Sequence, residues 1–213
     1  MRGVLITLEG IDGSGKTTVA NALANSLPEA RPAKTFVFTS EPTHGEAGKI
    51  LRSLLVDRSP EISEKISRAK RMEELCLFMA DHANHLARTV IPRLNDGAIV
   101  ISDRYADSTV AYQGVTLKSI VPKPLDWIKE VYSPWNVTPN MTLFFSIKPE
   151  KAIRRIGSRE NKEKFEQFDF LKEVDRNFHE IIKREPNRFV IIDGEREADL
   201  IAKEAFEAIL KLI

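Results

Sequence analysis

A glycine-rich segment near the N-terminus constrains the fold of this chain most strongly. Residues 10–17 read Gly-Ile-Asp-Gly-Ser-Gly-Lys-Thr and follow an apolar run, GVLITL at 3–8. The spacing matches G-x-x-x-x-G-K-[ST], a loop whose backbone N–H groups turn inward around phosphate oxygens at the start of a helix. The loop predicts a nucleotide phosphate site. Its expected members are Gly10, Asp12, Gly13, Ser14, Gly15, Lys16, Thr17 and Thr18.

Three side chains of this loop have expected roles. Lys16 is expected to reach the β- and γ-phosphates, and the Thr17 hydroxyl to bind Mg²⁺. Asp12 is different, because a carboxylate beside bound polyphosphate is electrostatically costly. We expect Asp12 to face a second substrate and to accept a hydrogen bond from a sugar hydroxyl. The alternative is a turn residue that only favours its local backbone geometry.

Four further apolar runs predict the rest of a sheet, at 35–40, 98–102, 141–147 and 188–193. They do not alternate with polar residues, which is typical of parallel strands buried on both faces. Apolar residues at helical spacing separate the runs, and this alternation predicts an α/β sandwich. We expect the first helix to stop before Pro28 and the helix over 61–91 to end near Pro92. The aromatic stretch 127–139 is expected to be irregular.

The composition excludes several classes of protein. The chain has 213 residues, which predicts a single domain over 1–213, and its 42% hydrophobic content excludes intrinsic disorder. The 32 Lys and Arg nearly balance the 31 Asp and Glu, so no polybasic membrane or nucleic-acid surface is indicated. Cys76 is the single cysteine, and no uncharged apolar run is long enough to span a membrane. We expect a cytoplasmic protein without nucleic-acid or membrane partners.

Charged residues follow two of the predicted strands. Ligands of open α/β sheets bind beyond the carboxyl ends of the strands. Asp103 is expected there as a second group for Mg²⁺, and Arg104 as a bridge between donor and acceptor phosphates. Glu41 follows the second strand, where it could orient Arg52. The alternative for Asp103 and Arg104 is a structural pair that caps the strand. The alternative for Glu41 is a position in a surface turn.

Four motifs occur in order along the chain: GIDGSGKTT at 10–18, SEPT at 40–43, LFMADHANH at 77–85 and DRYADSTVAYQG at 103–114. Together they resemble the thymidylate kinases, a family that transfers the γ-phosphate of ATP to dTMP. The resemblance implies a three-layer P-loop sandwich whose five-stranded parallel sheet has the strand order 2-3-1-4-5. It also implies a homodimer formed through helices.

The resemblance further implies a dTMP site. Phe78 is expected to stack on thymine, and Arg52 and Arg104 to grip the phosphate, while Asp12 accepts from the 3′-hydroxyl. Thr109 and Gln113 are expected at the base edge, and the Tyr112 ring beneath the deoxyribose. The alternatives are a core role for Phe78 and Tyr112. The further members of the expected site are Glu41 and His82.

This sequence departs from the family pattern in three places. His82 stands where the family usually has an arginine that donates to the thymine carbonyl, and Ser40 stands where the turn often has an arginine. Gly13 stands where some members have a basic residue. Members without that base place catalytic arginines in a lid over ATP. The expected lid is 148–164, with seven basic and three acidic residues. Its expected catalytic residues are Arg155 and Arg159, and a solvated helix surface is the alternative.

Three other functions compete with this interpretation. A regulatory GTPase would need an N-K-x-D motif, and the nearest string, 161–164, lacks the Asp. A kinase for dUMP, UMP, CMP or a deoxynucleoside stays open because of His82. A non-enzymatic protein that binds nucleotide or single-stranded DNA is the third alternative.

Overall fold

The computed structural model describes residues 2–56, 64–157 and 167–213. Each of the five apolar runs forms a strand, and every neighbouring pair is parallel. The strand order is β2-β3-β1-β4-β5, which confirms the predicted P-loop sandwich topology. The strands are β1 (Val4–Glu9), β2 (Phe36–Ser40), β3 (Ile99–Asp103), β4 (Met141–Ser146) and β5 (Phe189–Asp193).

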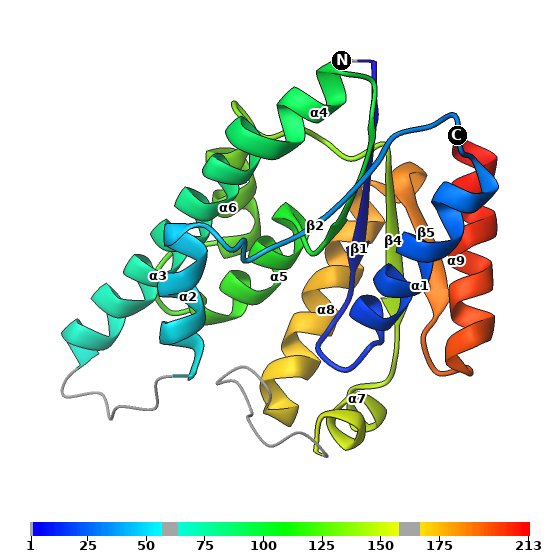
Figure 1. Ribbon diagram of the computed structural model, residues 1–213. Helices are drawn as coiled ribbons and strands as arrows, with labels where there is room; N and C mark the ends of the chain where they lie inside the picture. The colour runs from blue at the N-terminus through cyan, green and yellow to red at the C-terminus, as the bar shows by residue number, and fades with distance from the viewer. Residues whose placement is uncertain (1, 57–63, 158–166) are drawn as a thin grey trace.

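Helices cover both faces of the sheet (Figure 1). Helices α1 and α9 lie on one face; α3, α5 and α8 lie on the other, where α2 packs on α3 and α6 on α5. The helices are α1 (Lys16–Ala30), α2 (Glu46–Val56), α3 (Glu64–His85), the π-helical turn η1 (Leu86–Val90), α4 (Ile91–Asn95), α5 (Ala106–Thr116), α6 (Pro124–Tyr132), α7 (Pro149–Ile156), α8 (Phe168–Arg184), the 3₁₀ turn η2 (Pro186–Arg188) and α9 (Ala198–Leu212).

The core divides into two clusters because successive residues of a strand point to opposite faces. Phe144 packs in the cluster under α5 and α8, and its neighbour Phe145 packs against α1 and α9. Both rings are 0% exposed. Burial on both faces explains why the strands read as continuous apolar runs rather than as alternating ones.

Two helices continue past prolines that were expected to end them. Helix α1 contains Pro28 and runs to Ala30, because the proline lies in the last turn and removes only one helical hydrogen bond. The long helix continues through the wider turn η1 and past Pro92 to Asn95. Pro92 lies in the first turn of α4, where a backbone N–H group has no partner within the helix, so the missing N–H of proline costs little.

Two other helices have no counterpart in the sequence-based expectations. Helix α6 occupies the first part of the stretch that was expected to be irregular. Helix α5 has nine buried residues among its eleven, so it has no polar face that would reveal a helical period. No helix within the described ranges is long and apolar enough to cross a membrane.

The register of the sheet brings its polar strand ends together. Asp103 at the end of β3 pairs with Leu8 on one side and with Ser40 on the other. Glu9 follows Leu8, and Glu41 follows Ser40. Both carboxylates therefore lie at the same edge of the sheet as Asp103. This edge carries the candidate site.

Candidate active site

The predicted phosphate loop connects β1 to α1 at this edge. Gly10, Gly13 and Gly15 have φ values of 145°, 81° and 95°, which side chains rarely adopt. The Lys16 ammonium donates to the carbonyls of Gly10 and Ile11, at 2.9 Å each. Burial lowers the pKa of Lys16 to about 8. The loop therefore holds an enclosed ammonium whose acceptors a phosphate group can replace.

Helix α7, in the first part of the expected lid, lies directly on this loop. A Cβ atom at Gly13 would stand 2.6 Å from the backbone oxygen of Ala152 on α7, so no side chain fits at this position. Arg155 of α7 donates to the carbonyl of Gly194 at 2.8 Å and to that of Gly13 at 3.4 Å. The structure thus brings Arg155 beside the phosphate loop. Arg159 lies outside the described residues.

Two oxygen-bearing side chains meet beside the start of α1. The Thr17 hydroxyl donates to Oδ2 of Asp103 at 2.6 Å. The other oxygen, Oδ1 of Asp103, is buried and has no hydrogen-bond partner in the described part of the chain. Hydroxyl and carboxylate oxygens suit Mg²⁺, which takes few protein ligands and many from phosphate and water. Among the described residues there is no cluster of three or more His, Cys, Asp or Glu that could hold a metal by itself.

Arg104 is held in an unusual backbone conformation next to this pair. Its φ is 68°, in the left-handed region. Its N–H donates to the carbonyl of Leu8 at 3.0 Å, and its carbonyl accepts from the Ser102 hydroxyl at 2.7 Å. The N–H of the next residue, Tyr105, donates to the carboxylate of Glu9 at 2.9 Å. Three bonds therefore fix the turn that aims the Arg104 side chain.

The Arg104 guanidinium makes contacts with the phosphate loop and with α5. It forms an ion pair with Asp12, donates to the Ser108 hydroxyl at 3.1 Å and lies 5.1 Å from the centre of the Tyr112 ring. The Tyr112 hydroxyl donates to the other oxygen of Asp12 at 2.7 Å. The Asp12 carboxylate thus points towards α5 and away from the interior of the phosphate loop, where its negative charge would repel bound phosphate.

A cavity of about 140 Å³ opens beside this cluster. Seven of the predicted dTMP-binding residues line it, and four further residues, Pro42, Leu55, Tyr105 and Ser108, were not predicted. The motifs did not point to these four, because neither an apolar wall nor a serine that bonds a buried carboxyl group has a chemical signature in a single sequence. The predicted residues that line the cavity are Asp12, Glu41, Arg52, Phe78, Arg104, Thr109 and Tyr112.

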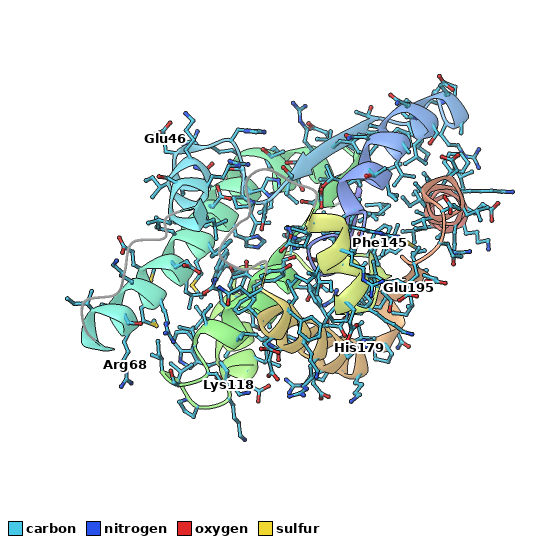
Figure 2. All side chains as sticks on the ribbon, turned by 90° about the horizontal axis from the view of Figure 1, so that it is seen from below. Glu46, Arg68, Lys118, Phe145, His179 and Glu195 are labelled. Atoms are coloured by element: carbon cyan, nitrogen blue, oxygen red, sulfur yellow. The ribbon has the colours of Figure 1, made fainter. Side chains whose placement is uncertain are left out.

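A second, larger cavity of about 530 Å³ contains Thr17 and Asp103. Four residues line both cavities: Glu41, Pro42, Arg52 and Arg104. They form the boundary between the smaller cavity, which Asp12 of the phosphate loop also lines, and a larger cavity beside α1 and the end of β2. Figure 2, a view from the carboxyl ends of the strands, shows α2 and α3 on one side of this edge, and α7 with Glu195 on the other.

Two predicted base contacts have no support in this geometry. His82 and Gln113 are both 0% exposed, and neither is among the described residues that line the cavity. The two ring nitrogens of His82 lie 2.7 Å from Glu41 and 3.0 Å from Asn136. The Gln113 amide donates to Glu74 at 2.9 Å and accepts from Thr116 at 2.7 Å. Both side chains are therefore already engaged within the protein.

The carboxylate of Glu9 links the end of β1 to the start of α5. One oxygen accepts from the N–H groups of Tyr105 and Ser108, at 2.9 and 3.2 Å, and the other bonds the Ser108 hydroxyl. Glu9 is 0% exposed. Its burial, followed by the negative charge of Asp107, raises the pKa of Glu9 from 4.5 to about 8. The folded protein thus favours the protonated carboxyl more than the unfolded chain does.

This shift predicts a pH-dependent stability that Glu9→Gln removes. The contribution of a carboxyl with a raised pKa is complete below its unfolded pKa and is lost as the pH rises through its folded pKa. With a pKa of about 8 for Glu9, the wild type loses stability between roughly pH 4.5 and pH 8. Gln keeps an oxygen for the two N–H groups. The melting temperature of Glu9→Gln minus that of the wild type should therefore be larger at pH 8 than at pH 5.

The matched control is Glu29→Gln, which makes the same substitution at an exposed carboxylate on α1. Its melting temperature should differ from that of the wild type by the same amount at both pH values. If Glu9→Gln behaved like this control, the account of Glu9 would be contradicted.

The fold and the site together define the class of this protein. A phosphate loop, a Thr–Asp pair suited to Mg²⁺ and an adjacent cavity lined by two arginines are the features of a P-loop phosphotransferase. The family model for thymidylate kinase matches residues 8–205. The chain therefore belongs to the thymidylate kinase family, whose members are enzymes.

Curated relatives of this family match nearly the whole chain or all of it. A probable thymidylate kinase of Methanosarcina barkeri is 45% identical over 213 residues, covering 100% of this chain and 98% of the relative. One of Methanococcoides burtonii is 43% identical, covering 100% and 99%. One of Halobacterium salinarum is 39% identical over 206 residues, covering 97% and 95%.

Proposed function

We propose that this enzyme transfers the γ-phosphoryl group of ATP to the phosphate of dTMP, giving dTDP and ADP. The observation that carries the proposal is that Arg104 contacts Asp12 of the phosphate loop and also lines the smaller cavity together with Arg52. Two guanidinium groups at this boundary suit two phosphates that must approach each other. Membership of the thymidylate kinase family supports dTMP as the acceptor.

The donor side is formed by the phosphate loop. Lys16 exchanges its carbonyl partners for the phosphates of ATP, while the loop N–H groups hold the phosphate oxygens. Thr17 and Asp103 hold Mg²⁺, which when bound neutralises charge on the phosphates. The unpartnered oxygen of Asp103 supports this assignment, because a buried carboxylate oxygen needs a partner.

The acceptor side is the smaller cavity. Phe78, which is partly buried, offers its ring to the thymine base, and a ring suits a flat base by stacking. Asp12 and Tyr112 lie together where the sugar would sit between base and phosphate. A dTMP phosphate oxygen then attacks the γ-phosphorus as the bond to ADP breaks. Positioning and charge neutralisation supply the catalysis without a covalent intermediate.

The lid supplies further positive charge to the transferred group. The Arg155 guanidinium donates to the backbone carbonyls of Gly194 and Gly13, and these bonds hold its positive charge beside the phosphate loop. We propose Arg155 and Arg159 as the catalytic lid arginines, and 148–164 as the lid of a single-domain enzyme.

Arg155→Ala should lower kcat about tenfold to a thousandfold, because charge stabilisation in the transition state is lost. The Kd for dTMP should change less than threefold. Arg154→Ala is the matched control, since Arg154 is the exposed neighbour on the same helix. Steady-state kinetics of both variants test this. Equal activity of the two variants would contradict the role of Arg155.

The acceptor is tested by coupled ADP release with dTMP, dUMP, UMP, CMP, AMP and thymidine. The highest kcat/KM is expected with dTMP. Activity with UMP or CMP and none with dTMP would replace the proposal with a kinase for another pyrimidine nucleotide. No ADP release with any acceptor would overturn it.

We further propose a cytoplasmic homodimer formed through helices. Ile50 on α2 is 50% exposed and Ile66 on α3 is 40% exposed, and α2 and α3 pack together. Apolar side chains on adjacent helices favour association. Sedimentation at micromolar concentration should give twice the chain mass, and a 24.1 kDa species would contradict the dimer.

A further inference from the structure

Two histidines of α3 meet a single carboxylate oxygen behind the acceptor cavity. Oε1 of Glu41 lies 2.7 Å from Nδ1 of His82 and 2.6 Å from Nδ1 of His85. The side chains of the three residues are 8%, 0% and 1% exposed, in that order. Glu41 lines the cavity, whereas neither histidine is among the described residues that do.

The two rings differ in the hydrogen-bond partner of their second nitrogen. The Nε2 atom of His82 faces the side-chain oxygen of Asn136 at 3.0 Å, and this oxygen can only accept. With the Asn136 amide in this orientation both nitrogens of His82 act as donors, which favours the imidazolium form. The Nε2 atom of His85 faces the Thr39 hydroxyl at 2.8 Å. A hydroxyl can donate as well as accept, so this contact does not require a second proton on the ring.

The surroundings of His82 support this assignment. Burial disfavours the charged ring, but the Glu41 carboxylate, the hydrogen bonds to Glu41 and Asn136, and the charge of Asp81 outweigh it and raise the pKa of His82. Burial disfavours the charged form of Glu41 as well, but the charge of His82 and the hydrogen bonds from His82 and His85 outweigh it and lower the pKa of Glu41. The aromatic rings that pack around His82 are those of Tyr105, Tyr132 and Trp135.

The charge of this ring changes the balance of the acceptor cavity. The charged residues among the lining are two carboxylates, Asp12 and Glu41, and two guanidinium groups, Arg52 and Arg104. These four charges cancel. A protonated His82, in contact with Glu41 and 4.6 Å from the centre of the Tyr105 ring, adds one positive charge directly behind the wall.

The geometry points to His82 as a buried cation that offsets the charge of Glu41 and so strengthens binding of the dTMP phosphate without touching the nucleotide. His82 is thus a positioning residue, and its action rests on the proposed function. Because the interaction is between the charge of His82 and the charge of the phosphate, it strengthens the binding of dTMP and leaves the binding of the uncharged nucleoside thymidine unchanged. The same charge discriminates between a nucleotide and a nucleoside at this site.

The test compares His82→Asn with His85→Asn by calorimetric titration of dTMP and thymidine at pH 7. Asn places an amide donor near the position of Nδ1, so each variant keeps a neutral donor for Glu41. We expect His82→Asn to raise the Kd for dTMP about tenfold and to leave the Kd for thymidine within twofold of the wild-type value. His85→Asn should leave both affinities within twofold. In kinetics, His82→Asn should raise the KM for dTMP and leave kcat within threefold.

Two outcomes of the titration would overturn the inference. Equal weakening of dTMP and thymidine by His82→Asn would show a structural role, and unchanged dTMP affinity would show that the charge has no effect. Nitrogen-15 NMR of the wild-type imidazole at pH 7 tests the claim even if a variant does not fold. Two protonated nitrogens on His82 are expected, and a neutral ring would overturn the inference.

The same titrations separate this inference from the proposed function. A wild type that binds dTMP no more tightly than thymidine would refute both the acceptor phosphate site and the action of His82 on it. A wild type that binds and phosphorylates dTMP, with a His82→Asn variant that binds it equally well, would refute the inference alone.

Discussion

The buried carboxylate of Glu9 is the constraint on which the site depends. It closes the end of β1, bonds the first N–H groups of α5 and bonds the Ser108 hydroxyl. Arg104 lies between these two elements in a left-handed conformation that a β-strand followed directly by a helix would not adopt by itself. Because Glu9 holds the chain on the far side of Arg104, the guanidinium reaches both Asp12 and Ser108.

This arrangement lets one side chain serve two compartments. The phosphate loop provides N–H groups and Lys16 on one side, and α3 and α5 provide a ring and polar groups on the other. Arg104 contacts Asp12 of the loop and Ser108 of α5, and Arg52 lines the same smaller cavity. A phosphoryl transfer requires two polyanionic groups to come close, and positive charge at their boundary reduces the repulsion. The fold thus places its cations where this repulsion is largest.

Much of this could be predicted from the sequence because its signals are local. The strands were identified since burial on both faces leaves uninterrupted apolar runs. Asp12 contacts Arg104 and Tyr112, and its bond to a sugar hydroxyl stays a prediction. Helix α5 was not identified, because burial all round removes its period. His82 and Gln113 were expected at the base, but a motif fixes a position along a helix and not the partners that neighbouring elements present. Ser108 was missed since its role depends on Glu9, 99 residues away.

The most direct test of this account is a crystal structure with dTMP and a non-hydrolysable ATP analogue. The account predicts that the dTMP phosphate contacts both Arg52 and Arg104, that thymine lies against the Phe78 ring and that Arg104 keeps its left-handed backbone. A dTMP phosphate bound away from both guanidinium groups, or a thymine ring outside the smaller cavity, would contradict it.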